Sequence, residues 1–534
     1  MTPAVLKPFS PHRAGRRMRP ASLLFVLSYS AITGALVALL PAQLLFLLAI
    51  PLLVAVVVIL WLLPEGAPPP VALLTALLVW FIGANTLWPS YISVDLPGLP
   101  WINPQRIVAF ALLTVALWSY STSGTMRAEI AEILRTVPFL RVAFWLFWAT
   151  TVITLAFSSE IGMSLNKWFN NQIFWTGMFG LAAWLGTKGG AIERVVRVIL
   201  WTTILVSLEV IYEFHIGQVP WLDHIPSFMT VDQAYLVNVL KSQGRAGTDI
   251  YRAHGTFTVS LVCAEYLAII FPFLIHELVI VPGLFRKLLM FAGSLAALSA
   301  MWLTNARSAM IGFFIAVFLY GGFAAYRYWR RQRQSLIGVS ALAMMPIAAM
   351  IFLALAITWP RLHTMTFGGS QHQPSSLARD DQWAMGLPKI RSNPVGYGVG
   401  RSGQTLGYAN LGGQLTIDTY YLSLVLEYGV LGYAAFMAMF LTPLFVGLKL
   451  YLRALPGEES MAGPIAIALL NFIVIKAVSS TEFNMPLAFV LLGFLVAVAW
   501  RQQQRIGIAV PARMISTRGY RTIAVGAMQR SGMA

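Results

Sequence analysis

Apolar runs of similar length recur along nearly the whole chain, between Ala21 and Trp500. Each run approaches the roughly 20 residues that an α-helix needs to cross the hydrocarbon core of a bilayer. Helices and closed barrels are the structures that satisfy all backbone polar groups in lipid. Barrel strands would alternate apolar and polar residues over segments of about ten residues, whereas these runs are continuously apolar. The sequence therefore predicts an all-α, polytopic integral membrane protein.

The apolar runs predict one transmembrane domain over residues 21–504, with 12–14 spanning helices. Charged residues make up only 11% of the 534 positions, whereas soluble domains carry about 25%. A basic N-terminal segment at 1–20 and a basic tail at 505–534 flank the domain. The fourteen candidate spans lie near 21–40, 42–63, 70–88, 105–121, 138–157, 169–187, 195–215, 257–281, 286–304, 307–326, 335–359, 419–447, 463–480 and 486–501.

Basic residues concentrate in short loops and in the tails beside the apolar runs. The net charge is +17, but this placement is typical of membrane orientation signals, so we expect no nucleic acid partner. With the N-terminus in the cytoplasm, alternating spans also place Arg327–Arg333 and the C-terminal tail there. Two long segments, at about 215–255 and 360–417, then fall on the outer side. Loops of this length are usually functional or disordered.

Several charged residues lie on the expected outer side, where the orientation pattern does not account for them. They are Arg252, Arg307, Arg379, Arg401 and Asp418, the last at the start of a span. Arginine stays charged and presents a rigid fork that matches phosphate oxygens. A ring of arginines at the membrane boundary therefore predicts a site for a diphosphate at headgroup depth.

Each of these residues also has a simpler interpretation. Arg379 precedes Asp380 and Asp381 and can pair with them locally, although an exposed pair contributes little. His254, close to Arg252, is first of all a histidine at the membrane interface. Asp418 suits the N-cap of the following helix, and it can still accept a proton from a hydroxyl group.

Proline and repeated glycines mark the stretch Asn393–Arg401, which reads NPVGYGVGR. Such a stretch predicts a tight, exposed backbone whose N–H groups can face an anion. Asn393, Gly398 and Gly400 therefore join His254 and the arginines as candidate binding residues. The stretch does not follow the strand–glycine loop–helix order of a nucleotide site.

Buried acids inside the spans need partners. Glu427 lies about 13 Å, or two and a half turns, along the helix that Asp418 opens, and Lys476 in the thirteenth span predicts a structural Glu427–Lys476 pair. Glu265 is a second buried acid without a named partner. The single cysteine, Cys263, and the lack of a Cys/His cluster predict no disulfide, no metal and no other cofactor.

Four segments together resemble the O-antigen ligase and polymerase superfamily of bacterial envelope glycan synthesis. Arg252–Phe257 is similar to its arginine and Gly-Thr-Phe segment before a span, and Leu303–Met310 to its Leu-Thr and Ser-Arg segment. Arg379–Gly400 is similar to its Arg-to-Trp and Asn-Pro-to-Gly stretch, and Asp418–Gly432 to a stretch that starts with His-Asn and ends in spaced glycines. The order and spacing agree over the C-terminal half.

The resemblance implies a metal-independent glycosyl transfer at the periplasmic face of a bacterial inner membrane. The donor would be a glycan on undecaprenyl diphosphate, with Arg252 and Arg307 at the diphosphate, Arg401 at the diphosphate or the glycan, and Asp418 as base. Membrane lipid, a chain-length regulator and other glycan-assembly proteins are the further partners that it implies. Family ligases carry histidine where this chain has Asp418, which favours a polymerase of exopolysaccharide or O-antigen repeat units.

Four alternatives stay open beside the polymerase. The first is an O-antigen ligase, which differs mainly in the acceptor. The second is a lipid-linked sugar flippase or transporter, which would place ionisable groups near mid-membrane. The third, a glycosyltransferase that uses a metal and lipid monophosphate sugars, would need acidic residues in the first outer turn, and Pro41-Ala42-Gln43 has none. The fourth is a non-catalytic assembly scaffold, since sequence does not show turnover.

Overall fold

The computed structural model describes residues 68–95, 102–231, 251–360, 362–363, 373–409, 413–453 and 458–505, with the single positions 28, 58 and 66. The chain divides into two compact units, Met1–Gly66 and Ala67–Ala534. The expected spans at 21–40 and 42–63, apart from two single positions, and both basic tails lie outside the described residues. The fold below is that of the second unit.

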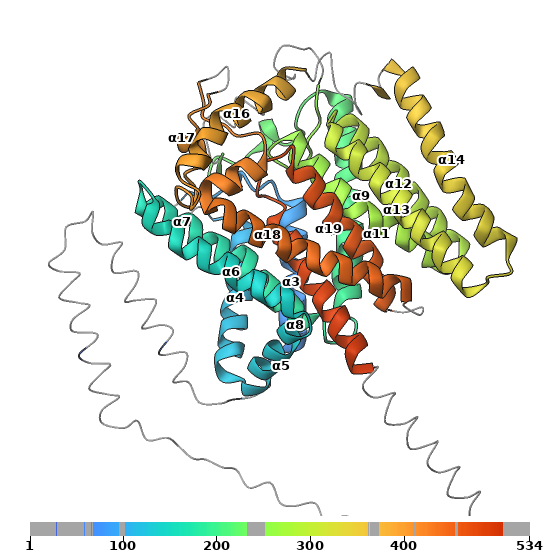
Figure 1. Ribbon diagram of the computed structural model, residues 1–534, viewed down its shortest axis with the longest axis horizontal. Coiled ribbons are helices and arrows are strands. Elements are labelled where there is room, and N and C mark those ends of the chain that lie inside the picture. Colours follow the sequence, from blue (N-terminus) through green and yellow to red (C-terminus); the bar gives the residue numbers. More distant parts are fainter. Residues whose placement is uncertain are drawn as a thin grey trace, which may run out of the picture. The chain divides into compact units, whose positions relative to one another are not determined.

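Helices build almost all of the described part of this unit (Figure 1). They are α3 (Val71–Leu87), α4 (Pro104–Thr122), α5 (Gly124–Arg135), α6 (Pro138–Ile153), α7 (Ile161–Asn171), α8 (Met178–Leu185), α9 (Ala191–Ile216), α11 (Ser260–Ile280), α12 (Leu284–Leu303), α13 (Arg307–Arg331), α14 (Leu336–Thr358), α16 (Gln373–Ser392), α17 (Ser402–Leu406), α18 (Tyr420–Arg453), α19 (Ala462–Lys476) and a final helix, Met485–Arg505. Short 3-10 helices are η2 (Thr154–Phe157), η4 (Leu222–His224) and η6 (Glu458–Met461), and η3 (Gln172–Gly177) is a π-helix.

The prediction of an all-α, multi-pass membrane protein is confirmed. Among the described residues, 8 helices are long and apolar enough to cross a membrane, or 9 if α4 and α5, bent by 100°, form one span. The expected spans match these helices closely. The one at 169–187 differs, because it consists of the end of α7, the π-helix η3 and α8.

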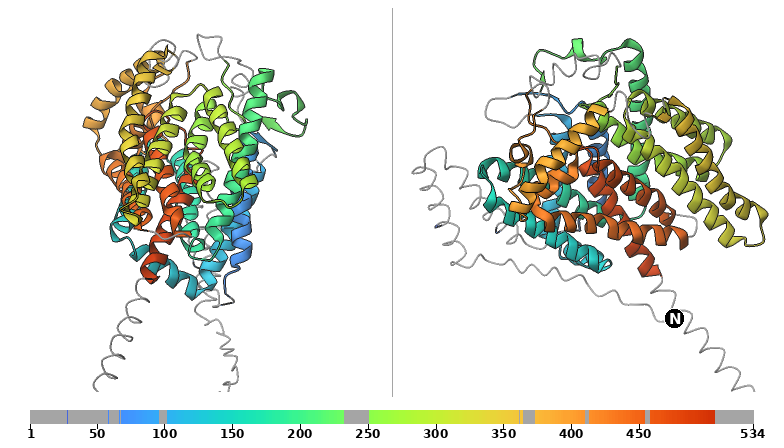
Figure 2. Two further views of the ribbon diagram at one scale, coloured as in Figure 1. Left: turned by 90° about the vertical axis from the view of Figure 1, so that its right-hand side faces the viewer. Right: turned by 45° about the horizontal axis from the view of Figure 1, so that its top comes forward.

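The helices of the bundle differ widely in how much of their surface is buried. The final helix is the most enclosed, with 89% of its apolar window buried, whereas α14 has 6% buried and packs along α13. Helices α11, α13 and α19 pack against one another, while α9 packs against α3 and α12. The side views show α14 at the edge of the bundle (Figure 2). An apolar helix that buries so little of its surface in protein has lipid as its natural environment.

The segment between α14 and α18 is not the plain loop that its composition suggested. It contains α16, a 20-residue helix rich in polar and charged residues, and the short α17. Both lie over the beginning of α18 (Figure 1). The other long connection is tied down by a two-stranded antiparallel sheet of β1 (Ile92–Ser93) and β2 (Thr230–Val231).

Helix α18 is interrupted at Gly429, where φ is +72° and ψ is 178°. Only glycine adopts this conformation without strain. The interruption leaves main-chain groups of the helix free to bond elsewhere. The carbonyl of Leu426 accepts from the N–H of Tyr397 (2.8 Å), and the N–H of Val430 donates to the carbonyl of Pro394 (2.9 Å).

The predicted Glu427–Lys476 pair is wrong. Lys476 instead pairs with Glu265 at 2.7 Å, and both side chains are fully buried. Glu427 pairs with Lys167 of α7 at 3.2 Å. Packing decides the partners, because α19 lies beside α11, which carries Glu265. The side chain of Asn484 also donates to the Glu265 carboxylate at 3.1 Å.

We expect Glu265→Gln and Lys476→Met each to lower the free energy of unfolding by about 3–5 kcal/mol, because each leaves an uncompensated buried charge. The double variant should cost less than the sum of the two single changes, since it leaves no lone charge. Thermal unfolding in detergent measures this. Lys188→Met is the matched control: its pair with Glu129 is 27% and 40% exposed, and the loss should stay below about 1 kcal/mol. Additive losses at Glu265 and Lys476 would contradict the pairing.

Candidate functional site

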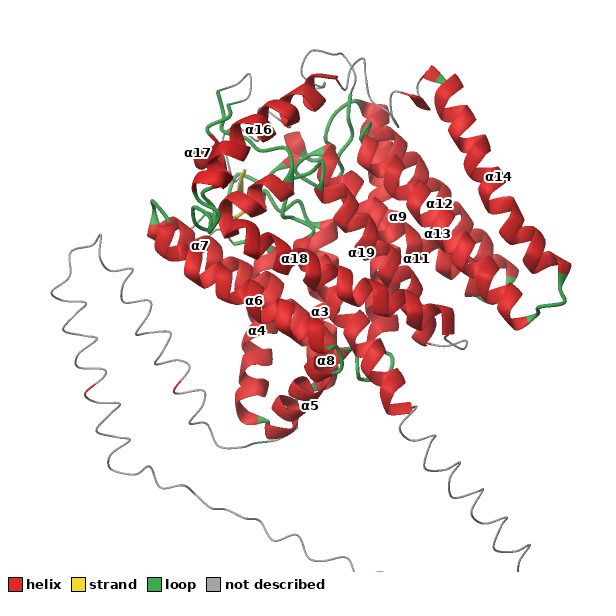
Figure 3. Ribbon diagram, in the orientation of Figure 1, coloured by secondary structure: helices red, strands yellow, loops and turns green. Residues whose placement is uncertain are grey.

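The candidate residues gather at one end of the bundle, which we call the loop end. Here α9 ends, α12 meets α13, and α18 begins, and the loops lie beside α16 and α17 (Figure 3). Side chains from four distant parts of the sequence meet there. Arg379 is close enough to Arg307 and to Asp418 for their charges to interact, and Arg252 is bonded to the corner before Arg307; we call these four residues the arginine cluster.

Arg252 lies in the connection that leads into α11. Its Nε donates to the carbonyl of Thr304 at 3.1 Å, so this connection is held against the corner between α12 and α13. Thr256 anchors the same connection on the other side, since its hydroxyl donates to the carbonyl of Thr86 at the end of α3 (2.6 Å). Arg252 therefore reaches the corner that presents Arg307.

Arg307 is the first residue of α13 and follows a very short corner. Helix α12 ends at Leu303 and α13 begins at Arg307. Asn305 has φ +48°, a left-handed conformation that asparagine tolerates better than most residues. The Arg307 Nη2 donates to the hydroxyl of Ser376 on α16 at 3.2 Å. The corner thus fixes where the guanidinium lies.

Arg379 and Asp418 complete the cluster. Arg379 lies on α16, one turn after Ser376, and is close enough to Arg307 for their charges to repel. Burial lowers the pKa of Arg379, while Asp418 and Asp380 act in the opposite direction. Burial raises the pKa of Asp418, and Arg379 partly offsets this rise. Arg379 therefore interacts both with its local neighbour and with Asp418.

Asp418 does not occupy the helix boundary itself, since α18 begins at Tyr420. Its backbone N–H donates to the Gln382 side-chain oxygen at 2.8 Å, and Gln382 is fully buried. Thr419, between Asp418 and the helix, accepts from the N–H of Ser423. Thr419, and not Asp418, is thus the residue that precedes the first turn of α18, so the expected N-cap role does not explain Asp418.

Several buried polar atoms around the cluster have no hydrogen-bond partner in the part of the chain that the structure describes. One is an acceptor, Asn305 Oδ1 in the corner before Arg307, and the other three are Arg379 Nε, Gln382 Nε2 and the hydroxyl of Ser308. Buried donors without an acceptor are rare and costly. All three can donate, and two positively charged groups stand beside them. An anion with several oxygens would satisfy these donors and reduce the repulsion between Arg307 and Arg379.

The stretch Asn393–Arg401 docks into the interruption of α18. The N–H groups of Tyr397 and Gly398 donate to the carbonyls of Leu426 and Glu427, and that of Gly396 to Asn393. A Cβ on Gly396 would lie 2.6 Å from the nitrogen of Gly429. These N–H groups are directed at protein carbonyls and not at open space, in contrast to the anion-facing backbone that the sequence suggested.

The comparison with known families bears on the same region. Residues 292–437 match the family model described as O-antigen ligase. We call this segment the O-antigen ligase domain, after the family that it resembles. It covers about a quarter of the chain and includes Arg307, Arg379, Arg401 and Asp418, whereas Arg252 precedes it. No curated protein matches the chain.

The O-antigen ligase domain thus confirms the resemblance to the ligase and polymerase superfamily. The protein carries a domain of a family of glycan-assembling membrane enzymes. The roles of single residues are a separate matter and stay predictions. His254, one of the predicted binding residues, is buried, and its ring Nδ1 lies 3.1 Å from the carbonyl of Gly255.

Arg401 of the O-antigen ligase domain bonds to a different part of the chain from the other three arginines. Its Nη2 pairs with Glu160 at 2.8 Å, and its Nε donates to Ser159 at 3.1 Å. Both partners lie in the connection between α6 and α7. Gly398 and Gly400 pack on the same region, where added Cβ atoms would approach Ser158 and Lys167 closely. This stretch joins the domain to the preceding helices.

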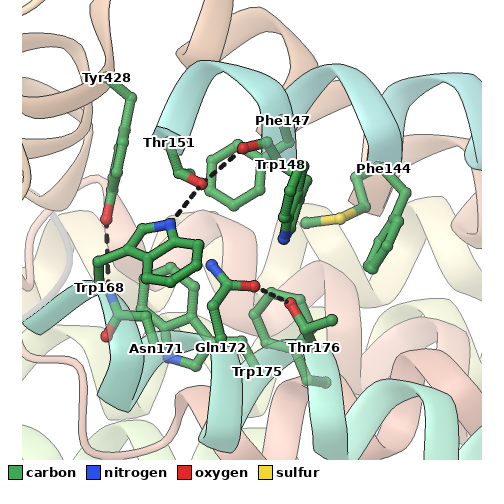
Figure 4. A pocket seen from close by; sticks show the side chains of 12 residues that line it. Phe144, Phe147, Trp148, Thr151, Trp168, Asn171, Gln172, Trp175, Thr176 and Tyr428 are labelled. Carbon is green, nitrogen blue, oxygen red and sulfur yellow. Dashed lines mark hydrogen bonds between the residues drawn. The ribbon is translucent and has the colours of Figure 1, made fainter. Parts of the chain in front are cut away.

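Apart from the arginine cluster, the structure has a hollow between α6, the end of α7, η3 and α18 (Figure 4). It is lined mainly by aromatic side chains, and its polar groups pair with one another. Trp168 donates to Thr151 at 3.0 Å and Asn171 to Tyr428 at 3.2 Å. Such satisfied, apolar surroundings are typical of packing. The arginine cluster, with its unpaired donors, is therefore the better candidate site.

Sequence reasoning missed the uncharged members of the site. Ser376 and Gln382 lie on α16, one face of which points toward Arg307 and Asp418. Their spacing to Arg379, three residues on either side, is the spacing of one helix face. Recognising α16 as a helix would have revealed them. Among the described residues, no group of three or more His, Cys, Asp or Glu could hold a metal ion.

Proposed function

We propose that this protein joins glycans carried on a lipid diphosphate, and that it is a polymerase of undecaprenyl diphosphate-linked repeat units. The arginine cluster is the active site, and the loop end faces the periplasm of a bacterial inner membrane. The observation that carries the proposal is that Arg379 lies within electrostatic range of both Arg307 and Asp418, while Arg252 is bonded to the corner before Arg307, with buried donors that lack acceptors among the described residues. A diphosphate supplies the acceptors and the negative charge.

The reaction follows from this arrangement. A hydroxyl oxygen of the acceptor sugar attacks the anomeric carbon of the donor glycan and forms the new glycosidic bond. The bond from that carbon to the diphosphate oxygen breaks, and its electron pair leaves with the lipid diphosphate. Asp418 takes the hydroxyl proton, since a carboxylate held near arginines stays available as a base.

The arginines act on the charge that grows on the leaving diphosphate. Fixed cations in a partly enclosed site stabilise such charge strongly, because they need no reorganisation during the reaction. Arg379 is the cation whose charge acts on Asp418, Arg307 neighbours Arg379, and Arg252 extends the cluster toward α11. We assign Arg401, together with Gly398 and Gly400, to holding the O-antigen ligase domain on α7 rather than to the diphosphate.

An O-antigen ligase is the second candidate, and the description of the matched family favours it. The two functions use the same donor and the same cluster but differ in the acceptor. Asp418, where family ligases carry histidine, favours the polymerase. Deletion of the gene followed by glycan analysis distinguishes them. Loss of long polymer with single repeats retained supports the polymerase, whereas accumulation of free lipid-bound polymer supports the ligase. An unchanged glycan profile would overturn both.

The pH dependence of the rate tests the base directly. Asp418 must be ionised to act, so activity falls as the pH drops through its pKa. Arg379 lowers this pKa, and Arg379→Gln therefore moves the acid limb of the kcat profile to higher pH. Arg391→Gln, an exposed arginine on the same helix, should leave the limb in place. An acid limb that does not move in Arg379→Gln would contradict the assignment.

A further inference from the structure

A single carboxylate, that of Glu213, holds the connection that carries Arg252. Glu213 lies in the last turn of α9 and is fully buried. It accepts from the Tyr251 hydroxyl at 2.7 Å, from the N–H of His254 at 3.1 Å and from the N–H of Gly255 at 2.6 Å. Its three donors stand on both sides of Arg252 in the sequence.

The position of Glu213 in the helix makes this arrangement informative. A negative charge in the last turn of a helix is opposed by the partial negative charge of that helix end. A buried carboxylate also needs hydrogen bonds to offset its lost hydration. The connection at 251–255 contributes all three donors. Their hydrogen bonds offset both the lost hydration of the carboxylate and its repulsion by the helix end. Helix α9 and this connection therefore stabilise each other through one side chain.

Gly255 shows how closely the connection is fitted to α9. Its φ is +61°, and an added Cβ would lie 2.6 Å from the Glu209 carboxylate and 3.0 Å from Val210. The backbone must approach the helix this closely for the N–H of Gly255 to reach Glu213. The connection is therefore held at two points. Gly255 packs closely against α9, and the Arg252 side chain bonds to Thr304 in the corner between α12 and α13.

We propose that Glu213 is a positioning residue for Arg252 and thereby sets the geometry of the arginine cluster. The inference rests on the proposed function for its effect on the substrate, but its structural part stands by itself. Glu213 holds the backbone of 251–255, and this backbone delivers the Arg252 guanidinium to the corner where Arg307 begins α13. The hydrogen bonds of the Glu213 carboxylate in the described part of the chain go to Tyr251, His254 and Gly255, so it acts on Arg252 through the backbone.

Amide hydrogen exchange of the full-length protein in nanodiscs tests the structural part. Glu213→Gln replaces one acceptor oxygen by a donor, so exchange in the peptide 251–257 should rise about 10-fold or more. Glu209→Gln is the matched control: it changes the same group one helical turn earlier, and the Glu209 oxygens accept no hydrogen bond in the described part of the chain. Exchange in the final helix should stay constant in both variants and shows that they fold.

Glu213→Asp provides a second variant if Glu213→Gln does not fold. It keeps the charge but withdraws the carboxylate by one methylene, so exchange at 251–257 should rise less than in Glu213→Gln. Exchange at 251–257 that equals that of the unchanged protein would overturn the inference. The same holds if Glu209→Gln raises exchange there as much as Glu213→Gln does.

Binding of undecaprenyl diphosphate tests whether Glu213 acts through Arg252. We expect Glu213→Gln to raise Kd about 10-fold, and Arg252→Ala combined with Glu213→Gln to bind no more weakly than Arg252→Ala alone. If the Kd of the double variant rises by the product of the two single effects, the positioning role is overturned. If Arg252→Ala binds like the unchanged protein, the proposed function of Arg252 fails, while the exchange experiment still decides what Glu213 holds.

Discussion

Asp418→Asn should abolish polymer formation while the protein is still made and folded. The substitution keeps the size of the side chain and removes its ability to take a proton. A positioned general base contributes about 10²- to 10⁴-fold to a rate, so kcat should fall within this range. The backbone N–H of Asp418 keeps its bond to Gln382 in the variant, and the local structure has no reason to change. Polymer assays with purified lipid-linked repeat units measure the loss.

Two controls give this result its meaning. Asp381→Asn neutralises an exposed acid on α16 and should leave the rate within about 2-fold, as expected for a solvated surface charge. Binding of undecaprenyl diphosphate by Asp418→Asn should be preserved or improved, because a negative charge near the diphosphate is lost. Normal polymer yield from Asp418→Asn would remove this residue from the mechanism.

Arg307→Ala should produce the second large loss, of about 10²- to 10³-fold in kcat, since it removes a fixed cation from the developing diphosphate charge. Arg307→Lys should recover only part of the rate, because an ammonium group does not reproduce the planar fork of a guanidinium. The measurement is the initial rate at saturating donor, with Kd for undecaprenyl diphosphate determined separately. Full activity in Arg307→Lys would indicate that charge alone matters at this position.

The control for Arg307 is Ser376→Ala on α16. Ser376 is the hydroxyl that accepts from Arg307, so its removal loosens the guanidinium without removing the charge. We expect a loss that is smaller than that of Arg307→Ala and larger than that of a surface change. An Arg307→Ala variant with the same rate as Ser376→Ala would mean that the cation contributes nothing beyond this bond.

The helices of this protein were predictable because lipid imposes one strong rule on sequence. A continuous apolar run of spanning length has few structures open to it, and the short corner before Arg307 was found on this basis. Helix α16 escaped prediction because it lies outside the apolar runs, is rich in polar residues and contains Pro388. Its helical character depends on packing against α18, which no local pattern reveals.

The candidate site was partly predictable for a related reason. Arginines on the expected outer side stood out, because the orientation pattern left them unexplained. Partner choice was not predictable, as Lys476 and Glu265 show, since it depends on which helices become neighbours. The same holds for Arg401, whose partner Glu160 lies 241 residues away in the sequence. The sequence therefore shows where a charged residue lies at the membrane boundary, but it does not show which group that residue pairs with.

The docking of the Asn393–Arg401 stretch on the interrupted helix α18 has an evolutionary consequence. The joint is made by main-chain atoms, so it places little demand on the exposed side chains of Val395 and Val430. It places a strict demand on Gly396 and Gly429, whose backbones touch and have no room for a methyl group. In related chains, these two glycines should persist or disappear together, while the side chains at Val395 and Val430 vary.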